Sequence, residues 1–225
     1  MITIFRKAAM LKAVSQDSRL LGACAVRHLL VMILLLLTVT ASAQDTTYLY
    51  SYNQKRINST KTAMLVLGGW GVANLATGLI GNSTAGGEAK YFHRMNAVWG
   101  VVNMGIAAAS YLGNRRLDPG KYNWQGSVNE QHKIEKIFLV NGALDLAYMA
   151  GGLFMREHGK TKLMGTGHDR WKGYGNSLIM QGAFLLLFDG INFTLHHHQG
   201  KGLFSRFEQL QLTVAPGGAG MVYQW

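Results

Sequence analysis

Two acidic residues lie inside long apolar stretches of the sequence. Asp145 falls within the apolar run 134–155, and Asp189 falls within the run 174–196. A carboxyl group in hydrocarbon is costly unless it is paired, hydrated or protonated, so each acid is a candidate functional residue. Two roles are open for this pair: a path for protons or cations, or hydrogen bonding that holds neighbouring helices together.

Amide and imidazole side chains accompany the two acids at helical spacing. Intervals of three, four and seven residues place them on one side of each apolar run. Such polar faces are expected to turn toward other protein rather than toward lipid. We interpret His93 as a core histidine whose hydrogen bonds are satisfied. The predicted polar core comprises Asn74, His93, Asn96, Asn103, Asn141, Asp145, Gln181, Asp189 and Asn192.

Three consecutive histidines, His196 to His198, are the only pattern that invites a metal site. Adjacent residues on a helix point in different directions, so His196 and His198 are weak candidates that require an extended segment. No cysteine or group of acids stands nearby to complete a ligand set. We therefore predict that the protein binds no metal and no cofactor.

The sequence contains no recognised catalytic motif. Gly-x-Ser-x-Gly, His-Glu-x-x-His and a phosphate-binding glycine loop between a strand and a helix are all absent. An intramembrane enzyme using Asp145, Asp189 and His93 as acids or bases is an alternative that depends on residue types alone. We predict that the protein is not an enzyme.

The composition identifies the elements that must position these residues. Hydrophobic residues make up 48% of the 225 and charged residues only 15%, and the apolar residues are gathered into long runs. This pattern is typical of a polytopic all-α membrane protein. We predict a four-helix transmembrane domain over residues 62–198, with spans at about 62–81, 91–114, 134–155 and 174–196.

The first 43 residues have the pattern of an export signal. A basic lead precedes the apolar core His28–Val39, and Ala41-Ser42-Ala43 provides a cleavage site. Met10 is an alternative start, and an uncleaved anchor is the alternative interpretation of the segment. Residues 44–61 are predicted to form a polar lead-in at the periplasmic interface.

The signal and four spans together predict the topology. Residue 44 enters the periplasm, and four crossings return the chain there, so the mature N-terminus and the tail 199–225 are predicted to be periplasmic. The basic stretch 156–172 then lies in the cytoplasm, as the positive-inside rule favours. The predicted location is the bacterial inner membrane. Within the tail, period-two alternation on both sides of Pro216 predicts a short β-hairpin.

The net charge of +11 does not indicate nucleic-acid binding. Four of these charges fall in the predicted signal, and the rest stand at the ends of apolar runs rather than on one aromatic-rich helix. The predicted partners are the lipid bilayer and either a membrane protein or a second copy of the chain. The single cysteine, Cys24, excludes an intrachain disulfide.

The four predicted spans resemble two related pairs. Gly71–Ala76 matches Gly142–Ala147 in its glycine, polar residue, leucine and alanine positions. This match predicts a duplicated helix pair, with the two halves in the same orientation.

The segment Tyr91–Trp99 with Val102–Asn103, followed later by Gln181–Phe184 and Phe188–Asp189, resembles a family of uncharacterised bacterial four-span membrane proteins. The resemblance covers about residues 48–225. It implies a fold class and a membrane location, and it transfers no activity and no catalytic residue.

The sequence therefore predicts a structural, accessory or interaction protein in the membrane. The alternative is a small transporter or channel for protons or cations that uses Asp145 and Asp189. An intramembrane enzyme is the third hypothesis.

Overall fold

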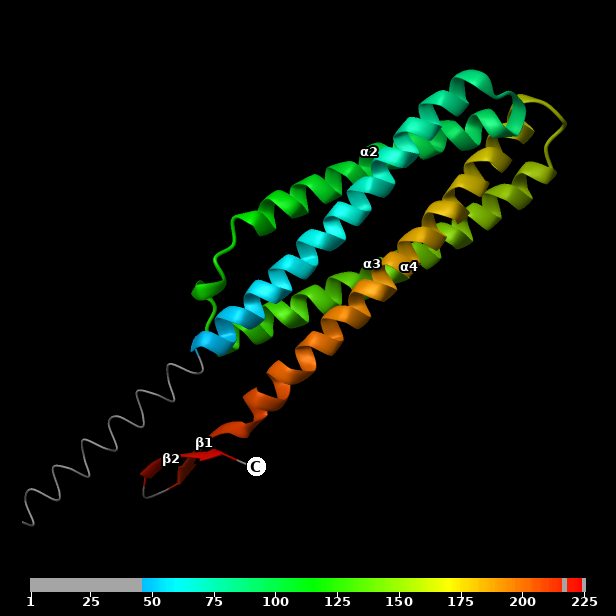
Figure 1. The fold of residues 1–225 in the computed structure, drawn as a ribbon. Coiled ribbons are helices and arrows are strands. Elements are labelled where there is room, and N and C mark those ends of the chain that lie inside the picture. Colours follow the sequence, from blue (N-terminus) through cyan, green and yellow to red (C-terminus); the bar gives the residue numbers. More distant parts are fainter. Residues whose placement is uncertain (1–45, 216–217, 224–225) are drawn as a thin grey trace, which may run out of the picture. The chain divides into compact units, whose positions relative to one another are not determined.

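A computed structural model describes the backbone of residues 46–215 and 218–223, with side chains as far as Arg206. The predicted signal peptide, residues 1–43, lies outside the described residues. Four long helices precede two short strands (Figure 1). The helices are an N-terminal helix Thr46–Thr84, α2 Gly87–Arg115, α3 Trp124–Lys160 and α4 Thr166–Gln209, with a short 3-10 helix η1, Pro119–Lys121, before α3.

Three of the helices are long and apolar enough to cross a membrane, as judged by length and composition. They are the N-terminal helix, α3 and α4. The 29 residues of α2 would span about 43 Å, which is sufficient length. Its asparagines, glycines and charged first turns lower its hydropathy, however, so α2 is not among the candidate spans. The prediction of four spans is thus supported for three of them.

The helices extend well beyond the predicted spans. Residues 46–61, predicted as an interfacial lead-in, form the first turns of the N-terminal helix. The predicted loops 82–90 and 156–172 shrink to the short breaks before Gly87 and after Lys160. Hydropathy marks where a helix becomes apolar rather than where its backbone hydrogen bonds begin, so polar helical turns escaped the prediction.

Local signals account for the breaks between helices. Gly87 and Gly165 adopt φ values of +58° and +136°, which non-glycine residues rarely adopt. The side chain of Asn123 accepts a hydrogen bond from the Gly126 amide at 2.8 Å, which caps the start of α3.

Glycines bring the backbones of neighbouring helices into contact. A Cβ atom on Gly78 would lie 2.5 Å from the Ala97 amide nitrogen, and one on Gly71 would lie 2.9 Å from the Gly100 carbonyl oxygen. In the second pair, a Cβ on Gly152 of α3 would lie 2.6 Å from the Gly175 carbonyl oxygen of α4. No larger residue fits at these positions. Close approach at small residues is the usual means of helix association in lipid, where no hydrophobic drive exists between helices.

Two short strands follow α4. Strand β1, Leu210–Ala215, pairs antiparallel with β2, Gly218–Tyr223, with Leu212 opposite Met221. Pro216 and Gly217, between the two strands in the sequence, lie outside the described residues.

Candidate functional site

Gln181 of α4 stands at the centre of a buried amide network. Its Nε2 donates to Asn74 Oδ1 at 2.7 Å and to Asn96 Oδ1 at 3.2 Å, while its Oε1 accepts from Trp70 Nε1 at 2.9 Å. Asn103 also donates to Oε1, at a longer 3.5 Å. The network joins the N-terminal helix, α2 and α4. We refer to Trp70, Asn74, Asn96, Asn103, Ser177 and Gln181 as the Gln181 cluster.

The Gln181 cluster is neutral and its hydrogen bonds are largely satisfied. The Gln181 side chain has no exposed surface, and Asn74, Asn96 and Asn103 are 4%, 3% and 1% exposed. Ser177 donates to Asn96, and Asn74 also donates to the Trp70 carbonyl. Unmet amide groups are expensive in a dry interior, whereas a saturated network fixes the register of the helices. The chemistry of this cluster is therefore structural.

The two predicted membrane acids meet beside this cluster. The carboxyl groups of Asp145, from α3, and Asp189, from α4, lie close enough to interact with each other. Two ionised carboxylates in contact repel, so a hydrogen bond between these two groups would require a proton on one of them. Both residues are nearly fully buried, and Asp145 Oδ2 has no hydrogen-bond partner among the described residues.

The remaining predicted residues do not join either group. Asn141 is half-buried, and Asn192 donates only to the Phe188 carbonyl of its own helix. His93 packs against Gly81, and its buried Nδ1 has no partner in the described structure, so the prediction of a satisfied histidine is wrong for that atom.

The helix α4 continues through the three histidines, which separates the two weak metal candidates. His196 is 1% exposed and stacks on Phe138, whereas His198 is exposed. Among the described residues, no group of three or more His, Cys, Asp or Glu side chains is arranged to hold a metal ion.

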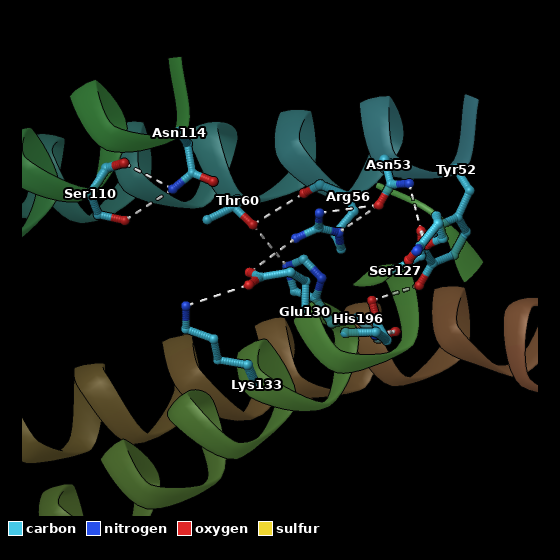
Figure 2. A network of polar contacts seen from close by, with 12 residues as sticks. Tyr52, Asn53, Arg56, Thr60, Ser110, Asn114, Ser127, Glu130, Lys133 and His196 are labelled. Atoms are coloured by element: carbon cyan, nitrogen blue, oxygen red, sulfur yellow. Dashed lines mark hydrogen bonds and ion pairs between the residues drawn. The ribbon is translucent and has the colours of Figure 1, made fainter. Parts of the chain in front are cut away.

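A second, charged cluster was not predicted from the sequence (Figure 2). The Arg56 side chain is 1% exposed and donates two hydrogen bonds to Asn53 Oδ1, at 3.1 and 3.3 Å. Its guanidinium lies 5.0 Å from the centre of the Tyr122 ring, and its nearest carboxylate, Glu130, is 3.9 Å away. Lys133 approaches the same carboxylate at 3.6 Å. We call Asn53, Arg56, Tyr122, Glu130 and Lys133 the Arg56 cluster.

Uncharged contacts attach this cluster to the surrounding helices. Asn53 donates to Ser127 Oγ at 2.8 Å, and Tyr52 donates to Gln131 Oε1 at 2.7 Å. Gln131 in turn donates to the His196 carbonyl at 2.6 Å. The start of the N-terminal helix is thereby fixed to α3 and α4.

The sequence does contain a signal for the Arg56 cluster. Asn53, Arg56 and Thr60 stand at intervals of three and four, on the face that continues with buried Met64 and Leu67. The prediction placed the start of the helix at the start of the apolar span, so it did not include this polar face. A polar stripe in register with an apolar one indicates a single continuous helix.

A cleft of about 760 Å³ opens between α2 and α3, with the Arg56 cluster at one end. The helix α2 packs on the N-terminal helix and α4, and α3 packs on α4, so α2 and α3 face each other across the cleft. Trp99 and Tyr148 meet across it with ring centres 5.1 Å apart. The walls are mostly apolar, and Asp145 and Asp189 also border it.

These features define a class: a helical bundle of membrane-spanning length, with a polar interior formed between helices. The chain belongs to DUF6992, a family of unknown function, whose family model matches residues 66–190. No curated protein and no solved structure matches the chain. The matched region contains the whole Gln181 cluster and both membrane acids.

Proposed function

We propose that this protein is a non-enzymatic integral protein of the bacterial inner membrane that acts as an accessory or interaction subunit. The Gln181 cluster is the observation that supports this proposal. Its polar atoms bond to one another across three helices, which leaves the interior amides engaged in holding the bundle. A catalytic centre would instead need a polar group free to meet a substrate.

We further propose that α2 crosses the membrane as a fourth span. Backbone contacts at Gly71 and Gly78 place α2 alongside a helix of membrane-spanning length. Buried Asn96 and Asn103 account for its low hydropathy, because both face the other helices rather than lipid. The mature N-terminus and the C-terminal tail are then both periplasmic.

Thiol labelling in intact spheroplasts tests this topology in a Cys24→Ser background. Lys121→Cys should react with a membrane-impermeant reagent, and Thr84→Cys should react only after permeabilisation. Both positions are exposed in the structure. Labelling of both cysteines, or of neither, in intact spheroplasts would show that α2 does not cross.

A second candidate function is a path for protons or cations. The two buried acids Asp145 and Asp189, which border the cleft, favour it, since Asp145 Oδ2 has no partner among the described residues. Liposomes that contain the purified protein separate the two functions. The accessory function predicts no proton or cation flux above that of empty vesicles. A flux that Asp145→Asn abolishes, and that Asn141→Asp leaves unchanged, would replace it with the transport function.

A further inference from the structure

The cleft between α2 and α3 is polar at one end and apolar along its length. Arg56, Glu130 and Lys133, with Ser110 and Asn114 of α2, line the polar end (Figure 2). Beyond them the walls are formed by Val102 and Ile106 of α2 and by Ile137 and Phe138 of α3. Ile106 and Ile137 remain 53% and 48% exposed, so the walls are not closed by other parts of the described chain.

The charges at the polar end do not balance. Arg56 and Lys133 share one carboxylate, Glu130, at 3.9 and 3.6 Å. Neither distance is that of a charge-assisted hydrogen bond, which is closer to 2.8 Å. Two other acids border the cleft: Asp145, which lies 12 residues beyond Lys133 on α3, and Asp189 on α4. Among the side chains that line the polar end, the positive charges therefore exceed the negative charges by one.

We propose that this cleft binds a single-chain amphiphile with one anionic head group. The head, a carboxylate or a phosphate, lies between Arg56 and Lys133, where it supplies the missing negative charge. The alkyl tail runs between Ile106 and Ile137 toward Trp99 and Tyr148. Asn103 is the member of the Gln181 cluster that borders the cleft, well away from Arg56 and Lys133 along α2. The proposal does not depend on which of the functions above the protein performs.

The dimensions fit one chain. From Lys133 to Tyr148 the wall formed by α3 rises through 15 residues, or about 22 Å, which exceeds the ~15 Å of hydrocarbon in one leaflet. The volume of about 760 Å³ is that of a pocket for a single small ligand. A transmembrane helix is about 10 Å in diameter and would have to displace the contact between Trp99 and Tyr148. The alkyl tail of an amphiphile is thinner and can end at this contact without displacing it.

Photo-crosslinking in vesicles tests the proposal. The full chain is reconstituted with a diazirine-bearing fatty acid, irradiated, and mapped by mass spectrometry with and without competing oleate. We expect oleate to suppress labelling of residues 98–106 and 137–144, and to leave labelling of the lipid-facing residues unchanged. Methyl oleate, which has the same tail and no charge, should need about a tenfold higher concentration for the same protection. Acetate should not protect.

Variants separate the head from the tail. Ile106→Trp fills the cleft and should abolish the oleate-sensitive labelling, whereas Leu139→Trp, at an exposed position outside the cleft, should preserve it. The Lys133 side chain is 65% exposed, so Lys133→Gln should not affect folding. It should raise the oleate concentration for half-protection several-fold. Equal protection by oleate and methyl oleate would refute the anionic head. Unchanged labelling in Ile106→Trp would refute the cleft as the site.

Discussion

The interior of this bundle differs between its two ends. Around Gln181 the helices approach at glycine contacts, the polar groups are neutral, and the hydrogen bonds of the Gln181 side chain are between 2.7 and 3.5 Å. Around Arg56 a cleft separates α2 and α3, charged groups line it, and the ion pairs are 3.6 Å or longer. The first end is built to hold helices together, and the second leaves space and charge for something else. Perturbing each end in turn tests this contrast.

The largest effect is expected at the closed end. Gly78→Leu forces a side chain into the Ala97 backbone, so it should lower the free energy of unfolding in mixed detergent micelles by about 3 kcal/mol or more. The same substitution at Gly69 meets no atom within 4 Å and should change stability by less than ~0.5 kcal/mol. Equal losses in the two variants would show that the N-terminal helix and α2 do not pack through these glycines.

Removal of the central amide should cost less than a backbone clash. Gln181→Leu leaves Asn74, Asn96 and Trp70 without their shared partner, and we expect a loss of ~2 kcal/mol in the same unfolding assay. Leu187→Ala, at a position 68% exposed on the same helix, is the matched control and should cost little. If Leu187→Ala lost more unfolding free energy than Gln181→Leu, the polar faces would have to point toward lipid.

The smallest loss of unfolding free energy is expected at the charged end of the bundle. Arg56→Gln removes one of two cations from Glu130, which is 31% exposed and keeps Lys133. We expect a loss of ~1 kcal/mol, because the ion pair is long at 3.9 Å and Glu130 is partly exposed. Arg56→Gln also removes the excess positive charge from the cleft. Its loss of unfolding free energy should therefore not exceed that of Gln181→Leu. If Arg56→Gln lost more stability than Gln181→Leu in the same denaturant series, the Arg56 cluster would contribute more to holding the bundle together than the Gln181 cluster.

Sequence reasoning identified the closed end better than the open one. The residues of the Gln181 cluster stand at helical spacing within apolar runs, where a polar side chain has few explanations other than contact with another helix. Asn74, Asn96, Asn103 and Gln181 could therefore be predicted to lie inside the bundle. The three asparagines meet at Gln181 only because each helix is rotated to the right angle about its own axis. The sequence pattern of a single helix does not contain that angle.

The open end escaped prediction because its residues lie outside the apolar spans. Arg56 belongs to a segment that hydropathy assigns to the interface, and its burial arises only when α3 and Tyr122 cover it. The cleft itself lies between α2 and α3, which pack on α4 rather than on each other, so it depends on the arrangement of several helices. The predicted helix duplication and the signal peptide remain predictions.

A double-mutant cycle between Asn74 and Gln181 tests the central claim, that amides of different helices hold the interior together. The two side chains are joined by a 2.7 Å hydrogen bond across 107 residues of sequence. Free energies of unfolding are measured for Asn74→Leu, Gln181→Leu and the double variant. The contact predicts a coupling energy of about 0.5–2 kcal/mol, the double variant losing less than the sum of the single losses. Strictly additive losses would mean that the two amides do not meet in the membrane and would contradict this architecture.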